Sequence, residues 1–336
     1  MDPRDPAFRA KLDAHLARYA GAEDRRAVAE VAATVVIYAL ALAGTALGLR
    51  LVQDAATGPA LFGALALTAL CAFVLAGTQV RAFLVHHDLT HGSLFTTRRW
   101  NDRLAPFVGA LVATAPSVWQ REHARHHRDS NNLDRSQDGQ TAAWTVADFE
   151  AAPGWQRALY RLVHQRPILF GVLPPLYFFG FMRVRARWYE NTAFFGFLAL
   201  LWATGSLGAF ALAMFPAMAF GFLVFHAQHT FENLVRHRTA EYDFVENGLL
   251  GSTLLVVPRW PVAGGFIDWA LYGVAYHHVH HLRPGLPAWR LKRIHEEGGA
   301  LFDATPRITL PEAWSSARLT LYDEAHGRLV SFAGGG

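Results

Sequence analysis

The chain has 336 residues, of which 52% are hydrophobic and only 17% are charged, and its formal net charge is +4. This composition is apolar for a soluble enzyme, and the length fits one or two domains. The single cysteine, Cys71, excludes a disulfide framework or a cysteine-held iron–sulfur cluster within the chain. No basic stripe is interleaved with aromatic residues, so we interpret the positive charge as membrane orientation and expect no nucleic-acid partner.

The N-terminal part of the chain predicts a membrane hairpin that follows a polar segment. Residues 1–30 are charged and lack a short apolar core with a cleavage site, so we expect a cytoplasmic segment and no signal peptide. Residues 31–49 and 60–80 contain no charge, and each stretch is long enough to cross the hydrocarbon core of a bilayer. We therefore predict spans at about residues 31–51 and 60–80, with the second helix continuing through Arg81.

The middle of the chain alternates apolar and polar segments. Residues 104–119 are apolar but short and contain two prolines, so we place them at the membrane interface or in a re-entrant segment. Residues 131–141 predict a polar loop and residues 144–165 an amphipathic surface helix. Residues 167–182 are apolar but interrupted by two adjacent prolines, and the sequence leaves open whether they enter the membrane.

A second hairpin is predicted further along. Residues 192–225 carry no charge and are interrupted at Gly205 and Ser206. At about 1.5 Å per residue this stretch gives two helices of roughly 25 Å, slightly short for two spans. Trp188 and Tyr189 are interfacial anchors that lengthen the first helix. We expect spans at about residues 188–204 and 207–226.

Histidine is the residue type that points to chemistry. Three clusters carry histidines at i, i+3 and i+4 or at i and i+4, a spacing that directs imidazoles from one face of a helix. They contain His87 and His91; His123, His126 and His127; and His277, His280 and His281. With 17 histidines in the chain, one HxxHH is expected by chance about 0.04 times, so two copies are not accidental.

The number of clustered histidines predicts two metal ions. Neutral imidazole is the commonest metal ligand among side chains, and eight imidazoles exceed the roughly four to six positions of one ion. Imidazole sites suit zinc, copper, iron and nickel alike, so the residues alone predict two transition metals without identifying them.

The clusters also constrain the topology. Two metals cannot be shared across a bilayer, so an even number of spans must separate the first cluster from the third. The second hairpin satisfies this condition if residues 167–182 do not cross. By the positive-inside tendency the arginines on the histidine side place the metal site in the cytoplasm. These arginines are Arg81, Arg98, Arg99, Arg103, Arg121, Arg125 and Arg128.

We therefore predict an all-α integral membrane protein with two transmembrane helical hairpins. A cytoplasmic helical cap would carry the histidine-rich dimetal site. The predicted divisions are an N-terminal segment (1–30), a membrane domain (31–300) and a C-terminal cytoplasmic tail (301–336).

In residue pattern and in order along the chain, the three clusters resemble the histidine boxes of the integral-membrane fatty acid desaturases. GTQVRAFLVHHDLTHGSLF and WQREHARHH resemble the first and second boxes of the acyl-lipid, delta-12-like branch, and HHVHHLRPGLP resembles the third. FHAQHTFE, at residues 225–232 with its histidine-bearing part at His226 to Glu232, resembles the additional histidine-bearing segment of that branch. The similarity covers roughly residues 60–300.

The resemblance implies a non-haem di-iron centre that uses dioxygen and two electrons to place a double bond in an acyl chain. The implied ligands are His87, His91, His123, His126, His127, His229, His277, His280 and His281. His86 and His278 are additional histidines beside the family pattern. We expect them to line the site, because each points about 100° away from its neighbour around a helix. His226, one turn before His229, is a candidate to hold a metal-bound water.

A ligating imidazole usually donates its other N–H to a carboxylate or carbonyl. Asp88 is the best candidate for this role because the family pattern has Asp at that position. No separate catalytic residue is predicted, because oxidation of an unactivated methylene belongs to the metal and dioxygen. We interpret Phe83, Phe95, Trp119 and Phe225, near the clusters, as core or interface packing. The other candidate partners of the imidazoles are Glu122, Asp134, Glu232 and Asp243.

Electrons are expected from another protein. No GxGxxG follows a predicted strand, and the sequence contains no haem-binding or cysteine-rich module. We expect an external ferredoxin- or cytochrome-type donor. Four arginines are candidates to form the docking site of this donor, and contact with anionic lipid headgroups is their alternative role. These are Arg98, Arg99, Arg121 and Arg128.

Two other functions remain open. A carotenoid ketolase or hydroxylase, or an alkane or sterol hydroxylase, would use histidine boxes and iron on the same scaffold. A zinc-dependent hydrolase or a metal transporter would bind metal without redox chemistry. A transporter should bury ionisable groups near the middle of its spans, whereas these predicted spans are uncharged and the histidines lie at their ends.

Overall fold

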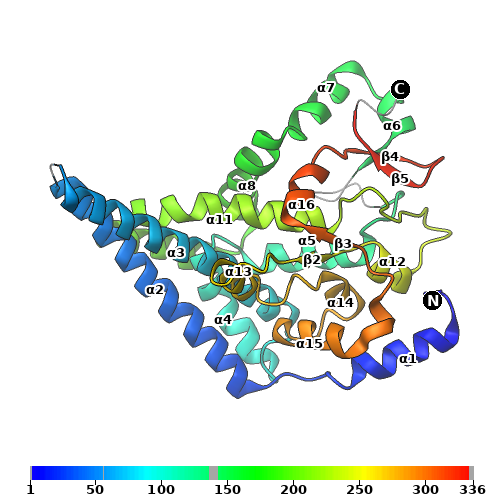
Figure 1. Ribbon diagram of the computed structural model, residues 1–336, viewed down its shortest axis with the longest axis horizontal. Coiled ribbons are helices and arrows are strands. Elements are labelled where there is room, and N and C mark those ends of the chain that lie inside the picture. The colour runs from blue at the N-terminus through cyan, green and yellow to red at the C-terminus, as the bar shows by residue number, and fades with distance from the viewer. Residues whose placement is uncertain (1, 56, 136–142, 333–336) are drawn as a thin grey trace.

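The two longest helices, α2 (Asp24–Asp54) and α3 (Pro59–His91), pack side by side in the computed structural model of the chain (Figure 1). The structure describes residues 2–55, 57–135 and 143–332. Small residues bring these two helices close together, because a Cβ at Gly48 would lie 2.4 Å from Thr68 Oγ1. At about 1.5 Å per residue α3 is roughly 50 Å long. It runs on to His91, which confirms that the second helix carries the first histidine cluster.

The second cluster lies on its own short helix. The apolar stretch expected at residues 104–119 is divided between α4 (Arg98–Leu111) and α5 (Pro116–Asp129). On α4, Trp100 and Phe107 are exposed, which fits a helix at a membrane interface. The histidines lie on the second half of α5.

The single surface helix predicted for residues 144–165 is wrong. The segment forms β1 (Trp144–Thr145), α6 (Val146–Ala151) and α7 (Gly154–Val163). A capping box between Thr145 and Asp148 starts α6. The helix then stops at Ala152, which is extended because it precedes Pro153. The polar loop expected at 131–141 lies largely outside the described residues.

Residues 167–182, for which the sequence left membrane entry open, belong to a continuous helical segment that extends to residue 185. It comprises η1 (Pro167–Val172), α8 (Leu173–Pro175), η2 (Leu176–Phe181) and α9 (Met182–Arg185). The two prolines do not end it, because π-helical turns on both sides accommodate the missing backbone donors. Two further apolar helices follow, α10 (Trp188–Ala203) and α11 (Leu207–Gln228).

Within the described residues, four helical segments are long and apolar enough to cross a membrane, namely α2, α3, Pro167–Arg185 and α11. The molecule is therefore an integral membrane protein. The predicted span at 188–204 corresponds to α10, which has 16 residues and is about 24 Å long. Arg50 donates a hydrogen bond to the backbone carbonyl of Thr204 (2.6 Å). The α2 end of the first hairpin therefore touches the turn between α10 and α11, and α3 and α11 run from these turns toward the histidines.

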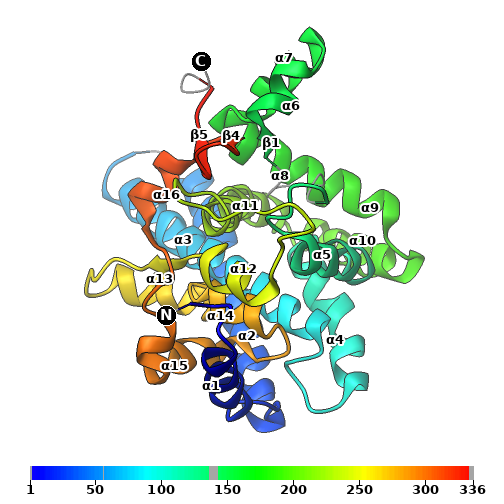
Figure 2. The same ribbon diagram turned by 90° about the vertical axis from the view of Figure 1, so that its right-hand side faces the viewer.

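The remaining elements surround the histidine-bearing ends of α3, α5 and α11 (Figure 2). β2 (Leu254–Val256) and β3 (Arg307–Thr309) pair in parallel, β1 and β4 (Leu321–Asp323) pair in parallel, and β4 and β5 (Arg328–Val330) are antiparallel. At the N-terminus, α1 (Pro6–Ala17) packs on α15 (Ala288–Gly298), where His15 Nε2 lies 2.8 Å from the Ile294 carbonyl. The elements are α12 (Phe244–Leu250), β2 (Leu254–Val256), α13 (Ala263–Leu271), α14 (His277–Leu282), α15 (Ala288–Gly298), η3 (Gly299–Phe302), β3 (Arg307–Thr309), α16 (Leu310–Ser316), β4 (Leu321–Asp323) and β5 (Arg328–Val330).

A buried arginine joins α3 to two other elements. Arg81 forms an ion pair with Glu30 of α2 and donates to the backbone carbonyl of Trp269 on α13 at 2.6 Å. Its guanidinium also lies 4.6 Å from the Trp269 ring centroid and 4.4 Å from the Tyr272 ring centroid. The cation therefore fixes α13, and the loop leading to the third histidine cluster, against the first hairpin.

We expect Arg81→Met to lower the free energy of unfolding by about 3 kcal/mol, because it leaves the buried Glu30 carboxylate without its buried partner. Arg26→Gln is the matched control, since Arg26 pairs with the same carboxylate but is largely exposed; it should cost less than about 1 kcal/mol. Unfolding of both variants in the same detergent measures the difference. Equal losses would show that the buried pair does not hold these elements together.

Candidate metal centre

Four helices bring histidines to one place. His87 and His91 lie on the last turns of α3, and the second cluster lies on the second half of α5. The third cluster forms most of α14, which begins at His277. His229 follows the last residue of α11 as its C-terminal cap.

The imidazoles form two groups, and within each group the potential ligand atoms lie within 4.8 Å of one another. The first group contains His87, His91, His123, His127 and His280. The second group contains His126, His229, His277 and His281. Together they hold all nine histidines that the sequence singled out as ligands.

The two groups are neighbours because α5 and α14 contribute to both. His126 and His127 are adjacent in sequence and point about 100° apart around the helix, so they belong to different groups. His280 and His281 divide in the same way. The ring centroids of His127 and His281, one from each group, are 4.6 Å apart. This arrangement provides two adjacent sites rather than one enlarged site.

The nitrogen separations in the first group fit a shared cation. His123 Nε2 lies 2.8 Å from His87 Nε2 and 3.0 Å from His127 Nε2, and the nitrogens of His87 and His91 are 3.2 Å apart. A neutral imidazole has one N–H, so converging nitrogens cannot all be satisfied by hydrogen bonds to one another. Two nitrogens bound to one ion at about 2.1 Å lie about 3 Å apart. His280 Nε2 is buried without a hydrogen-bond partner, as expected for a metal ligand.

The second group has the same geometry. His277 Nε2 lies 2.9 Å from His229 Nε2 and 3.0 Å from His281 Nε2, and the nitrogens of His126 and His281 are 3.2 Å apart. Burial lowers the pKa of His126 to about 3 and the pKa values of His277 and His281 well below the ordinary histidine value. The rings are therefore neutral, and each can present a lone pair to a metal ion.

The structure shows how two of these rings are oriented. His87 Nδ1 lies 3.4 Å from Asp88 Oδ1, and Asp88 Oδ2 accepts the Ala288 N–H at 2.8 Å. Asp88 therefore links the first cluster to the start of α15. His229 Nδ1 lies 3.2 Å from the backbone carbonyl oxygen of Gly251. A ligand's second nitrogen usually has such an oxygen acceptor, which fixes the ring tautomer.

The Gly251 carbonyl is itself held in place. Asn131, whose backbone φ is 60°, donates from Nδ2 to this carbonyl at 2.7 Å and to Asn247 Oδ1 at 2.8 Å. The sequence analysis missed Asn131, Asn247 and Gly251, because nothing in the spacing of these residues indicates that three distant segments meet. The positive φ of an Asn that follows the second cluster is visible only in the structure.

The other carboxylates proposed as imidazole partners have different neighbours. Glu122 pairs with Arg125 at 3.3 Å, and the side chain of Glu232 is exposed. In the described residues neither is within hydrogen-bonding distance of a histidine of either group. The same holds for the two remaining candidates, because Asp134 accepts from Arg238 (2.9 Å) and Asp243 from Arg9 (2.5 Å).

The three additional histidines lie outside both groups. His86 is fully buried, with its ring stacked near Phe83 and close to Gly109 of α4. His278 Nε2 lies 2.9 Å from His295 Nδ1, behind α14. His226 packs edge-to-face on Phe170, with ring centroids 5.8 Å apart. The positions of His86 and His278 follow from the rotation of about 100° per residue that separates each from the adjacent ligand candidate. His226 is three residues before His229, but α11 ends at Gln228 and His229 is no longer helical.

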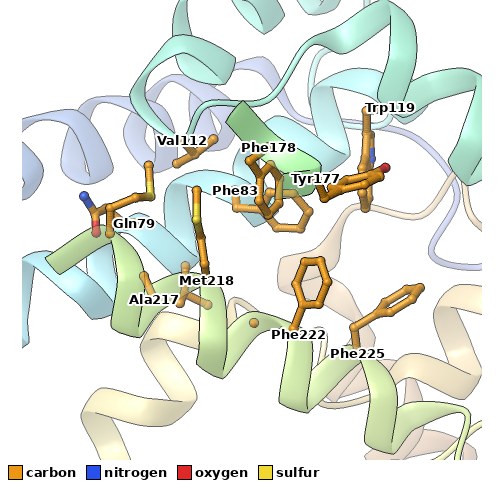
Figure 3. Close-up of a pocket in the computed structure, with 13 residues that line it drawn as sticks. Gln79, Phe83, Val112, Trp119, Tyr177, Phe178, Ala217, Met218, Phe222 and Phe225 are labelled. Atoms are coloured by element: carbon orange, nitrogen blue, oxygen red, sulfur yellow. The ribbon is translucent and has the colours of Figure 1, made fainter. Parts of the chain in front are cut away.

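An apolar pocket ends at the two groups (Figure 3). Trp119 stacks on His123 of the first group, with ring centroids 4.8 Å apart. Phe225 lies 5.0 Å from His126 of the second group. Figure 3 shows these two rings at one end of the pocket and Gln79 at the other. The pocket is lined by Gln79, Val80, Phe83, Val112, Trp119, Tyr177, Phe178, Met214, Ala217, Met218, Gly221, Phe222 and Phe225.

The interpretation of Phe83, Trp119 and Phe225 as packing residues is therefore incomplete, because all three line this pocket. A signal was present in the sequence. On α11 the lining residues run from Met214 to Phe225 at intervals of three and four, which is one face of a helix. That face spans about 16 Å along the helix.

The first group is also reached from the protein surface by a groove of about 560 Å³. Its walls include His91, His123 and His127, with Arg98 and Arg128 at its edge. The lining differs from that of the apolar pocket, since the two share none of their residues. The ligand groups therefore have an apolar approach and a polar approach.

We expect Gly251→Ala to lower the metal content of the purified protein from two ions toward one. The added Cβ would lie 2.3 Å from Asn247 Oδ1 and 2.6 Å from Asn131 Nδ2. This crowding displaces the carbonyl that orients His229. Gly265→Ala is the control, because nothing lies within 4 Å of its Cβ position. Elemental analysis gives the metal content, and two ions in Gly251→Ala would exclude this role of the carbonyl.

Comparison with known proteins agrees with this geometry. Residues 59–308 match the family model described as fatty acid desaturase. The chain is 30% identical over 281 residues to a fatty acid desaturase of Bacillus subtilis (strain 168), covering 79% of this chain and 78% of that protein. It is 25% identical over 290 residues to an sn-1 oleoyl-lipid 12-desaturase of Picosynechococcus sp., with 78% of each chain covered.

The match to another relative covers a smaller share of that protein. The chain is 26% identical over 241 residues to fatty acid desaturase 3 of Bos taurus, covering 67% of this chain and 53% of that protein. The family match includes the three histidine clusters and His229. With its membrane helices, its two histidine groups and a match over most of its length, the chain belongs to the fatty acid desaturase family, whose members are enzymes.

Proposed function

We propose that this enzyme inserts a double bond into a fatty acyl chain in an oxygen-dependent reaction at a di-iron centre. The observation that carries the proposal is the position of the apolar pocket. One of its end walls, Trp119, stacks on a histidine of the first group, and the other, Phe225, packs on a histidine of the second. A methylene between these two rings would face both metal sites.

Each part of the chain has a defined task in this reaction. The neutral imidazoles of both groups would hold the iron pair, which supplies the oxidation of two adjacent methylenes with dioxygen and two electrons. The aromatic walls position the acyl chain and exclude water from the reacting carbons. Asp88 and the Gly251 carbonyl keep His87 and His229 in the orientation that binding requires.

The choice of iron and of substrate rests on the family. Imidazole sites alone do not distinguish iron from zinc or copper. The residue pattern of the histidine boxes resembles that of the delta-12-like branch, and one relative is named an sn-1 oleoyl-lipid 12-desaturase. Both support an acyl-lipid substrate that already carries one double bond. The same scaffold would serve a carotenoid or alkane oxidase, but the family match favours an acyl chain.

We also propose a topology. The hydrogen bond between Arg50 and Thr204 supports two hairpins, α2–α3 and α10–α11, whose turns lie together on one side of the membrane. Residues 167–185 would then lie along the membrane interface, and both ligand groups would be on the other side. The arginines near the histidines support a cytoplasmic location for that side.

Production of the protein in a bacterium whose membrane lipids contain both saturated and monounsaturated acyl chains should yield new diunsaturated acyl chains, detected by gas chromatography of the lipids. The purified protein should contain about two iron ions and little zinc. His280→Ala should reduce both the iron content and the product, whereas His86→Phe, outside both groups, should retain the iron. Oxidised carotenoids or alkanes without new double bonds, or zinc in place of iron, would contradict the proposal.

The polar groove supports docking of an external ferredoxin- or cytochrome-type donor. Arg98 and Arg128 line it beside His91, and an acidic electron carrier would be attracted to these cations. Two other arginines of the predicted patch, Arg99 and Arg121, lie on the same two helices. Docking at this groove would place the carrier near the first metal site without entering the apolar pocket.

Arg98→Glu combined with Arg128→Glu should lower turnover with the protein donor by about tenfold or more, because repulsion replaces attraction at the groove. Turnover with dithionite as a chemical reductant should be unchanged. Arg157→Glu with Arg161→Glu, on α7, is the matched charge control and should affect neither rate. Equal loss with both reductants would exclude docking at this groove.

A further inference from the structure

The helix that carries the second histidine cluster depends on another helix for its N-terminal cap. In the described part of the chain, no side chain of α5 caps its own N-terminus, and its first turn contains no acidic residue. The helix begins at Pro116, which has no N–H, so the first backbone donor of α5 belongs to Ser117. Ser117 is buried, and a buried backbone donor needs an acceptor from elsewhere.

Glu190, at the start of α10, supplies this acceptor. Its Oε1 accepts the Ser117 N–H at 2.8 Å, and its Oε2 accepts the Ser117 hydroxyl at 2.7 Å. Oε2 also accepts the backbone N–H of Arg187, the N-cap residue of α10, at 2.9 Å. Glu190 is only 3% exposed. One buried carboxylate therefore caps two helices, and the positive end of each helix dipole favours an acidic group there.

A second contact holds the turn before α5 against the same part of the chain. Arg183, on α9, donates to the Ala113 carbonyl at 3.0 Å, and its guanidinium lies 4.6 Å from the ring centroid of Phe194 on α10. Ala113 has a φ of 54°, which an alanine rarely adopts unless its surroundings impose it. The turn at residues 113–117 is therefore shaped by α9 and α10.

This attachment matters because of what α5 carries. Trp119, two residues after Ser117, lines the apolar pocket. The second histidine cluster follows on the same helix and supplies ligands to both metal groups. Across the pocket from Trp119 are Phe222 and Phe225 of α11 (Figure 3). A shift of α5 would therefore move one pocket wall and ligands of both metal groups relative to the other wall.

We propose that Glu190 is a positioning residue for the oxidation. It fixes α5 in the position at which both metal groups keep their ligands and Trp119 faces the same part of the acyl chain as Phe225. In the described residues Glu190 belongs to neither metal group and does not line the pocket, so it acts through α5. Its effect on the position of the double bond rests on the proposed function, whereas its effect on the metal groups does not.

Glu190→Ala removes all three hydrogen bonds of this carboxylate. Hydrogen–deuterium exchange of the purified protein should show amide exchange about tenfold faster in the peptide that contains Ser117 and Trp119. Because α5 contributes ligands to both groups, EDTA should remove both metal ions severalfold faster than from the unsubstituted protein, as measured by elemental analysis. Faster loss of one ion only, or unchanged exchange and metal loss, would overturn the proposal.

Glu312→Ala is the matched control. Glu312 also accepts the backbone N–H of its own N-cap residue, Thr309, at 2.7 Å, but it is exposed and in the described residues has no hydrogen bond to α5. This variant should leave α5 exchange and metal loss unchanged. Glu190→Gln retains at most two of the three hydrogen bonds, because an amide has one oxygen, and should accelerate exchange by about threefold. If Glu190→Ala does not fold, unchanged exchange and metal loss in Glu190→Gln would contradict the proposal.

The reaction product provides a measurement that a general loss of stability would not change. In Glu190→Ala the acyl chain lies against a displaced α5, so about a tenth or more of the new double bonds should appear at neighbouring positions. Gas chromatography with mass spectrometry of picolinyl esters locates them. The unsubstituted protein and Glu312→Ala should each give one position. A single, unchanged position in Glu190→Ala, formed at a lower rate, would refute the positioning role.

Failure of this proposal can be told apart from failure of the proposed function. If the unsubstituted protein forms no double bond, the proposed function is wrong, and faster exchange and metal loss in Glu190→Ala would still support the role of Glu190 at the metal groups. If the unsubstituted protein forms double bonds and Glu190→Ala behaves like Glu312→Ala, only the role of Glu190 is refuted.

Discussion

The convergence of nine neutral imidazoles in a buried space is the constraint on which the rest of the structure depends. Ring nitrogens about 3 Å apart cannot all be paired by hydrogen bonds, since each neutral ring has one N–H. Without cations, this arrangement would leave buried lone pairs unsatisfied, as His280 Nε2 shows. The surrounding elements keep the rings together by burial and, for His87 and His229, by an oxygen acceptor at the outer ring nitrogen.

Helix geometry explains how so few elements supply two sites. On α5 and α14, residues at i and i+4 share a face, while the residue next to them in sequence points about 100° away. A short helix placed between two ions can therefore serve both. α3 and α11 add ligands at their C-terminal ends, and at the opposite ends of these helices Arg50 of α2 donates to the backbone carbonyl of Thr204, in the turn before α11.

The sequence predicted the parts of this arrangement that are local. The apolar length of α2 and α3, the continuation of α3 to His91, and the eight clustered histidines follow from spacing and hydropathy along the chain, whereas His229 was indicated by the resemblance to the desaturases. The groups that orient the imidazoles could not be predicted in this way, because Asn131 and Gly251 are far apart in the sequence and come into contact only in the folded structure. The error at residues 144–165 has a local cause, since Pro153 stops the helix that the apolar pattern suggested. Residues 167–185 stayed open because π-turns around two prolines have no simple sequence signature.

The two approaches to the ligand groups explain why the site lies at the ends of the helices and not within them. An acyl chain has favourable surroundings only among apolar side chains, and the pocket along α11 supplies them up to Trp119 and Phe225. The proposed electron carrier is polar and charged, and the groove beside His91, Arg98 and Arg128 would offer it a polar surface. A metal centre deep in the bilayer would be reached only through apolar surroundings. A metal centre on an exposed surface loop would be reached only through polar surroundings. Placement where α3 and α11 end gives the ligand groups both, because the same helices that line the apolar pocket carry the histidines at their polar ends.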